Sequence, residues 1–253
     1  MADFDVLCMQ EVARNFPGLP GSNGEDQFRL LADLLPGYAA IEGIGTDVRA
    51  VNGARSQFGN MILTRLPVLQ AFRHLLPWPS EPAVPSMQRV AVEVVLQAPW
   101  GPLRVTTTHL EYYSATQRAA QVERLRDLQA EAAAHAQDAD HSRKEGGPFQ
   151  NAARPVSAIL TADFNFRPAD PLYARLQAPY ADATPRYMDA WQIRHPGRPH
   201  APTIGVFDRE QWPEPFACDF IFVTGDLARR VREVRVNGDT DASDHQPVLL
   251  SLG

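Results

Sequence analysis

Six polar side chains in this sequence lie where runs of apolar and β-branched residues end or begin. They are Glu11, His109, Asp163, Asn165, Asp244 and His245, beside the runs 6–10, 103–108, 156–162 and the residues from Val248 onward. Short runs of this composition predict strands, so we expect the six side chains to gather along one edge of a sheet core. Phosphoester hydrolysis needs a cation, an aligned water and donors to the phosphoryl oxygens. Carboxylates, an amide and imidazoles collected at one edge could meet these needs.

Asp163 and Asn165 are separated by one residue, so both side chains would point to the same side of an extended segment. Asp163 could then orient or deprotonate a water molecule while the Asn165 amide donates to a phosphate oxygen. The alternative is an Asx-type turn that closes the strand, a common use of Asp and Asn. His109 has an alternative too, because a single histidine after a strand is often structural.

The remaining sequence predicts the elements that hold these groups in place. Strands are predicted around residues 39–44, 58–64, 68–75, 88–96, 103–110 and 156–162, and helices over 25–35, from 115 to about 135, and near 172–177 and 187–193. Ser114 and Gln117 have the spacing of a capping box. Residues 137–154 are polar and aperiodic and predict a mobile surface loop, whereas the prolines within 195–215 predict a rigid one. This order of elements predicts an α+β fold.

Length and composition set outer limits on the protein. The 253 residues allow one substantial core and show no shift in composition, so we expect a single domain over residues 1–253. A formal net charge of -6 mildly disfavours tight non-specific binding to duplex nucleic acid. Cys8 and Cys218 are predicted to be buried thiols, and they form no zinc motif. Since the sequence shows no leader and no long apolar stretch, we expect a cytoplasmic protein with no stable membrane insertion. The sequence leaves the oligomeric state open.

Six short motifs follow one another along the chain. They are Gln10-Glu11, Phe58-Gly59-Asn60-Met61-Ile62-Leu63-Thr64-Arg65, Thr108-His109-Leu110, Asp163-Phe164-Asn165, Cys218-Asp219-Phe220-Ile221-Phe222 and Ser243-Asp244-His245-Gln246-Pro247-Val248. In type and order they resemble the endonuclease/exonuclease/phosphatase superfamily, which includes pancreatic-type deoxyribonucleases, abasic-site endonucleases and sphingomyelinases. The resemblance covers nearly the whole chain. It implies a four-layer α/β/β/α sandwich of two packed, mainly antiparallel sheets with helices outside and the site at one edge.

The resemblance also implies a strand that this sequence does not contain. Members normally begin one strand earlier, with an Asn on that strand beside the position of Glu11. We therefore expect the sandwich to lack the family's first strand and to leave two strand edges unpaired. We further expect the coding sequence upstream of Met1 to continue with a short apolar strand that carries an Asn.

The resemblance assigns Glu11 and Asp244 to the metal site and Asp163 to the activation of water. Oxygen ligands without a cluster of Cys or His favour a hard cation, so we expect Mg²⁺ or Mn²⁺ as cofactor.

Phosphate binding is assigned by the same resemblance to His109, Asn165 and His245. Asp219 would hold His245 in one tautomer, with about 2.6–3.2 Å between the heavy atoms. Two further candidates for substrate binding are Asn60 and Arg89.

We therefore predict a magnesium-dependent hydrolase that cleaves phosphoester bonds, phosphodiesters above all, by in-line attack of an activated water. The substrate stays open among nucleic acid, a phospholipid headgroup and a small molecule. The sequence also leaves open the choice between diesterase and monoesterase, the number of metal ions and the identity of the general acid. The alternative, from a different class, is a catalytically inactive protein of the same fold that binds phosphate or nucleic acid.

Overall fold

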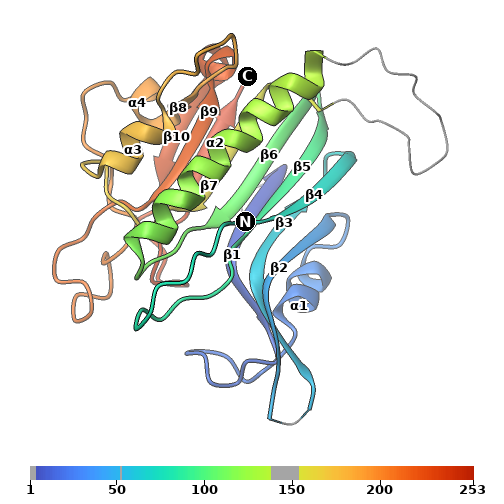
Figure 1. Cartoon of the computed structure of the whole chain (residues 1–253), viewed down its shortest axis with the longest axis vertical. Helices are drawn as coiled ribbons and strands as arrows, with labels where there is room; N and C mark the ends of the chain where they lie inside the picture. Colours follow the sequence, from blue (N-terminus) through green and yellow to red (C-terminus); the bar gives the residue numbers. More distant parts are fainter. Residues whose placement is uncertain (1–3, 52, 138–153) are drawn as a thin grey trace.

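The computed structural model describes residues 4–51, 53–137 and 154–253 (Figure 1). The loop expected over 137–154 lies outside this part of the chain except for its two end residues. The elements in chain order are β1 (Val6–Arg14), α1 (Gln27–Leu34), β2 (Ala39–Arg49), β3 (Arg55–Thr64), β4 (Val68–Leu75), β5 (Val90–Ala98), β6 (Gly101–His109), α2 (Ala115–Gln137), β7 (Ala158–Asp163), α3 (Pro171–Leu176), β8 (Tyr187–Asp189), α4 (Ala190–Arg194), β9 (Asp219–Thr224), the 3-10 helix η1 (Gly225–Arg230), β10 (Val231–Val236) and β11 (Val248–Leu252).

The larger sheet has six strands in the order β4-β5-β6-β7-β9-β8 (Figure 1). β6 and β7 run parallel, and every other neighbouring pair is antiparallel. β5 is buried at every residue except Gln97, as expected for a strand covered on both faces. The long helix α2 lies between β6 and β7 in the sequence and provides the crossover that a parallel pair requires. Because β6 and β7 run the same way, both end at the same edge of the sheet.

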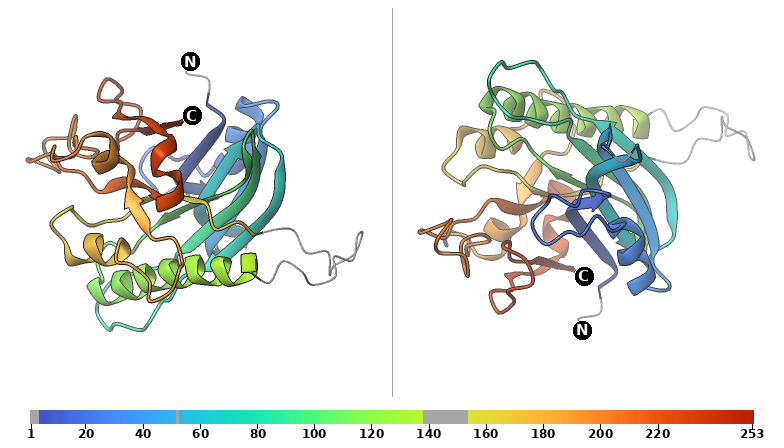
Figure 2. Two further views of the ribbon diagram at one scale, coloured as in Figure 1. Left: turned by 90° about the horizontal axis from the view of Figure 1, so that it is seen from above. Right: turned by 90° about the horizontal axis from the view of Figure 1, so that it is seen from below.

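Three apolar clusters separate four layers of secondary structure. The first lies between α2 and the larger sheet and includes Leu125, Leu160 and Phe222. The second lies between the two sheet layers and includes Ile62, Val94 and Val223, and the third packs α1 onto β1 and β3 and includes Phe28 and Met61. Figure 2 shows α2 along the outer face of the larger sheet. This confirms the predicted α/β/β/α sandwich with helices outside.

The second sheet layer consists of two pieces, β1-β3-β2 and β10-β11. Among the described residues, β1 and β11 each have a pairing partner along one edge only. Val6 and Cys8 of β1 and Val248 and Leu250 of β11 nevertheless pack on the same apolar cluster between the sheets. These are two unpaired strand edges of the kind expected from the sequence.

Two local predictions were wrong. Residues 187–193 were expected to form a helix, but β8 first pairs with β9, and α4 begins only at Ala190. The Asp189 carboxylate accepts the backbone N–H of Trp191 and so starts the helix at this point. At the start of α2, Ser114 Oγ accepts the N–H of Gln117, but the Gln117 amide donates to a carbonyl elsewhere, so the capping box is only half formed.

Gly59 of β3 allows a close approach to the backbone of β2. A Cβ at this position would lie 1.9 Å from the carbonyl oxygen of Gly43, a backbone atom that cannot move aside cheaply. We expect Gly59→Ala to lower the free energy of unfolding by about 1–3 kcal/mol. Denaturant titration measures this change. Gly18→Ala is the matched control, because a Cβ at Gly18 would meet no atom within 4 Å. Equal stability of the two variants would contradict this packing.

Candidate active site

Three neighbouring strands of the larger sheet place ionisable side chains in one row. His109, the last residue of β6, is in register with Asp163, the last residue of β7, and Asp163 is in register with Asp219, the first residue of β9. His109 Nε2 lies 3.4 Å from Asp163 Oδ2, and both side chains are buried. The pairing of the strands therefore fixes the spacing of these three groups, because residues in register point to the same face of a sheet.

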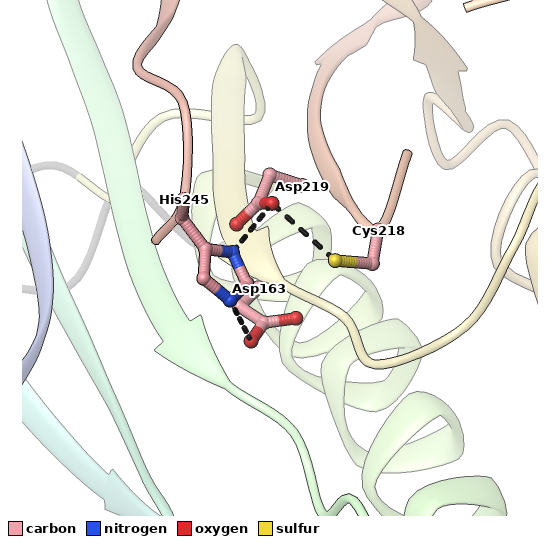
Figure 3. Close-up of side chains that lie close together, drawn as sticks. All are labelled: Asp163, Cys218, Asp219 and His245. Carbon is pink, nitrogen blue, oxygen red and sulfur yellow. Dashed lines mark hydrogen bonds and ion pairs between the residues drawn. The ribbon is translucent and has the colours of Figure 1, made fainter. Parts of the chain in front are cut away.

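His245 lies between the two aspartates of this row (Figure 3). Its Nδ1 is 2.8 Å from Asp219 Oδ2, and its Nε2 is 3.9 Å from Asp163 Oδ2. The hydrogen bond between Asp219 and His245 that the sequence analysis expected is therefore present. One ring joins two carboxylates that lie on adjacent strands.

The segment that carries Asp244 and His245 is a turn, and β11 begins only at Val248. Ser243 Oγ accepts the N–H of His245 at 3.1 Å and donates to Asp244 Oδ1 at 3.3 Å. Asp244 is exposed, and its negative charge acts on both His245 and Glu11. The turn removes the strand alternation that would have pointed the two adjacent side chains to opposite faces.

Glu11 lies on a bulge of β1. Gln10 and Glu11 together oppose the single residue Asn60 of β3, and Glu11 has a φ of 58°, which is uncommon for a residue other than glycine. The Gln10 amide donates to Thr107 Oγ1 at 2.7 Å and ties the bulge to β6. The Glu11 side chain is 64% exposed, with Oε1 3.5 Å from His109 Nδ1. The bulge directs this carboxylate to the same edge as His109.

Asn165 closes β7 in a turn rather than extending it. Its φ is 52°, and its N–H donates to Asp163 Oδ1 at 2.9 Å. This is the Asx-type turn considered as the alternative, so the extended geometry expected for residues 163–165 was wrong. The Asn165 amide nitrogen donates to the Leu110 carbonyl and to His109 Nε2, each at 2.9 Å. Both amide hydrogens are engaged, and Asn165 therefore holds the His109 ring in place.

The contact with Asn165 also determines the tautomer of His109. An amide nitrogen can only donate, so His109 Nε2 accepts and the ring proton lies on Nδ1. Nδ1 is buried and has no hydrogen-bond partner in the described part of the chain. Burial, with the positive charges of Arg89 and His245, keeps the pKa of His109 well below its usual range. His109 is thus a neutral donor whose N–H is directed toward the site.

Asp163 and His245, whose side chains form an ion pair, have opposite electrostatic surroundings. Burial and the neighbouring charge of Asp219 raise the pKa of Asp163 to about 7. Burial lowers the pKa of His245, but the hydrogen bond and charge of Asp219, with the charges of Asp163 and Asp244, outweigh it and raise the pKa to about 9. A carboxylate that titrates near neutrality beside a cationic imidazole can exchange a proton with water at physiological pH.

The raised pKa of Asp163 predicts that its charged form opposes folding. The folded pKa lies above the unfolded value of about 3.9, so the penalty is complete above pH 7 and disappears as the pH falls toward 4. In chelator, we expect Asp163→Asn to melt higher than the wild type at about pH 8, with a difference that shrinks toward about pH 5. Melting curves across this range measure the effect. A lower melting temperature of the variant at pH 8, or a difference that does not change with pH, would contradict it.

Arg89 directly precedes β5 and is held by a residue that the sequence analysis missed. Its Nε lies 3.3 Å from Glu111 Oε2, and both side chains are buried. Arg89 Nη1 is buried and has no partner in the described part of the chain. The charge of Arg89 acts on both His109 and Glu11, which places it beside the site. The only signal for Glu111 is its position, two residues beyond His109.

Asn60, the other candidate for substrate binding, is turned into the core. It is 3% exposed, and its amide donates to the Val90 carbonyl at 2.8 Å. The same carbonyl accepts the Thr108 hydroxyl. Asn60 thus links the two sheet layers beside the Glu11 bulge, and a contact with substrate stays a prediction.

The proline-rich loop supplies a second residue that was missed. Thr203 Oγ1 donates to Asp219 Oδ2 at 2.5 Å and accepts the backbone N–H groups of Cys218 and Asp219. The next residue, Ile204, forms a backbone bridge to His245. As expected, residues 195–215 contain no helix or strand. Thr203 could not be singled out because a threonine between Pro202 and Ile204 has no pattern around it.

This geometry agrees with a comparison of the sequence with known families. The sequence model of the Endonuclease/Exonuclease/phosphatase family matches residues 1–245. The chain belongs to this family. This match confirms the family resemblance that the six motifs indicated. The row formed by His109, Asp163 and Asp219 therefore lies on the fold of this hydrolase family.

Solved structures show the same fold. A family protein from Beutenbergia cavernae is 25% identical with a TM-score of 0.60, and the match covers 98% of this chain but only 63% of that one. A mannosyl-6-phosphatase from Bacteroides thetaiotaomicron is 18% identical with a TM-score of 0.63, covering 99% and 85% of the two chains. The human Nocturnin catalytic domain with bound sulfate is 16% identical with a TM-score of 0.55, covering 98% and 81%.

A search among curated proteins found no match to the sequence. Within residues 4–51, 53–137 and 154–253, no helix combines the length and the apolar character needed to cross a bilayer.

Proposed function

We propose that the protein is a divalent-metal-dependent hydrolase that cleaves phosphoester bonds, phosphodiesters above all, by in-line attack of water on phosphorus. The observation that carries the proposal is the row of Asp163 and Asp219 with His245 between them, beside the carboxylate of Glu11. A purely structural ion pair would not need two carboxylates in register, one of them with a pKa near 7. Perturbed titratable groups gathered at one sheet edge favour catalysis instead.

Glu11 and Asp244 are the residues that would hold the metal ion. Partial desolvation raises the pKa of Glu11, the charge of His245 lowers it, and the charges of Asp244 and Asp219 raise it further. A cation would offset these negative charges, and carboxylate oxygens are the ligands that Mg²⁺ and Mn²⁺ prefer. The residues therefore fit a hard divalent cation. When bound, such a cation supplies charge neutralisation on the phosphoryl oxygens.

The side chains around this position would then divide the chemistry. Asp163 would take the proton of the attacking water, because a carboxylate with a pKa near 7 is both ionised and usefully basic at slightly alkaline pH. The cationic His245 ring and the Nδ1–H of His109 would donate to the phosphoryl oxygens. Asp219 and Thr203 would hold His245, and Asn165 would hold His109. Glu111 would hold Arg89 through Nε, and Arg89 Nη1, which has no partner among the described residues, would add a further donor.

The substrate would come from nucleic acids, phospholipid headgroups or small phosphorylated molecules. The preference for diesters follows the motif resemblance to deoxyribonucleases and sphingomyelinases. Among solved proteins of the same fold is a mannosyl-6-phosphatase, so phosphomonoesters belong in any test.

A substrate panel tests the proposal. Bis(p-nitrophenyl) phosphate, p-nitrophenyl phosphate, oligonucleotides and phospholipid vesicles would each be assayed with Mg²⁺, with Mn²⁺ and with chelator. We expect hydrolysis of at least one diester that requires the metal ion and stops on its removal. Binding of phosphate or oligonucleotide without turnover under all conditions would instead support a catalytically inactive binding protein.

A further inference from the structure

Cys218 brings a sulfur atom to the row of catalytic side chains. It directly precedes Asp219 and is 2% exposed, with Sγ 3.4 Å from Asp219 Oδ2 and 3.9 Å from Thr203 Oγ1. Together with Asp163 and His245, it completes a group of four side chains whose potential ligand atoms all lie within 4.8 Å of one another. Figure 3 shows these four side chains pointing toward one another. The proposed functions of Asp163, Asp219 and His245 make no use of the sulfur.

We propose that Asp163, Cys218, Asp219 and His245 form a binding site for Zn²⁺ or a similarly thiophilic divalent cation, separate from the Mg²⁺ position at Glu11 and Asp244. Two carboxylates, one imidazole and one thiolate are common zinc ligands, and four are needed for a closed tetrahedral site. Mg²⁺ prefers six oxygen ligands in near-octahedral geometry and does not favour sulfur. The two sets of ligands therefore select different cations.

The dimensions of the group fit this assignment. Zinc–ligand bonds of about 2.0–2.3 Å in a tetrahedron place the ligand atoms about 3.3–3.8 Å from one another. Counted with one ligand atom per residue, all four atoms lie within 4.8 Å of one another, and Asp219 Oδ2 lies 2.8 Å from His245 Nδ1 and 3.4 Å from Cys218 Sγ. Rotations of the side chains would bring the four ligand atoms to these tetrahedral separations, without movement of β7 and β9.

The sequence contains no zinc motif here because the four ligands come from distant parts of the chain. Asp163 ends β7, Cys218 and Asp219 lie at the start of β9, and His245 lies in the turn before β11. Only the pairing of β7 with β9 and the placement of the turn bring them together. Zn²⁺ bound here would withdraw Asp163 and His245 from their proposed roles, so it would inhibit the enzyme.

Metal binding to the full chain, free of other metals and without substrate, tests the site whether or not the proposed reaction occurs. We expect the wild type to bind one Zn²⁺ per chain in calorimetry, and Cys218→Ser to bind it at least about tenfold more weakly. Cys8→Ser is the matched control, because Cys8 is the chain's other cysteine and lies outside the group. It should bind Zn²⁺ like the wild type.

Co²⁺ gives a second readout that does not require the Cys218 variant to fold. A thiolate ligand produces a charge-transfer band in the near ultraviolet, which we expect in the wild type and in Cys8→Ser and which Zn²⁺ should abolish by displacement. A wild-type Co²⁺ complex without this band, loss of the band in Cys8→Ser, or equal Zn²⁺ affinity of a folded Cys218→Ser and the wild type would each overturn the proposal.

Discussion

Asp163→Asn is expected to lower kcat for metal-dependent phosphoester hydrolysis by about 10²–10⁴-fold, the range that a positioned general base contributes. The asparagine side chain keeps an oxygen that can accept the N–H of Asn165, so the turn after β7 should persist. What it loses is the ability to take a proton, which the carboxylate has because burial raises its pKa to about 7. Steady-state kinetics with saturating Mg²⁺ measure the effect.

Asp33→Asn serves as the control for this variant. Asp33 lies on α1 with an exposed side chain that pairs with Arg29 one turn away, so its replacement should leave kcat unchanged. Equal kcat values for Asp163→Asn and the wild type, with both proteins folded, would show that Asp163 is not the base.

Asp219→Asn is expected to lower kcat by a similar factor, about 10²–10⁴-fold, by a different route. Asp219 accepts from His245 Nδ1 and from the Thr203 hydroxyl, so it orients the ring and stabilises its cationic form. Loss of this charge should bring the pKa of His245 down from about 9. In the variant, the imidazolium should therefore lose its proton at a lower pH than in the wild type. NMR titration of the His245 ring in metal-free protein measures the shift directly.

Thr203→Val provides a graded comparison for this second variant. It removes the hydroxyl that donates to Asp219 but leaves the carboxylate in place, so both effects should be weaker than in Asp219→Asn. An unchanged pKa of His245 in Asp219→Asn would contradict a positioning role for Asp219.

The sequence predicted the strand ends because hydrophobic runs determine them. The runs before His109 and Asp163 are buried strands, and their parallel pairing follows from the helix between them. The acid–imidazole contact of Asp219 with His245 was also predictable, since the resemblance of the six motifs in their order implies it.

Local backbone detail could not be predicted because it depends on tertiary pairing. The bulge that gives Glu11 a positive φ arises from the register of β1 against β3. The turn at Asn165 was weighed as an alternative, and sequence spacing alone could not choose between it and an extended segment.

Partners that are distant in sequence were missed for the same reason. Arg89 and Glu111 are joined only because β5 lies beside β6, and Thr203 reaches Asp219 from a loop without periodicity. Burial of Cys218 was expected, but its place beside Asp163 and His245 depends on the assembled sheet.

The most direct test of the central claim is the fate of the attacking oxygen. Hydrolysis of a phosphodiester in ¹⁸O-labelled water with Mg²⁺ should place one ¹⁸O atom in the phosphate-containing product and none in the released alcohol. The label should not appear when the metal ion is chelated, and its incorporation should be much slower in Asp163→Asn. Label in the alcohol, or no metal-dependent product from any phosphoester, would contradict attack of water on phosphorus at this site.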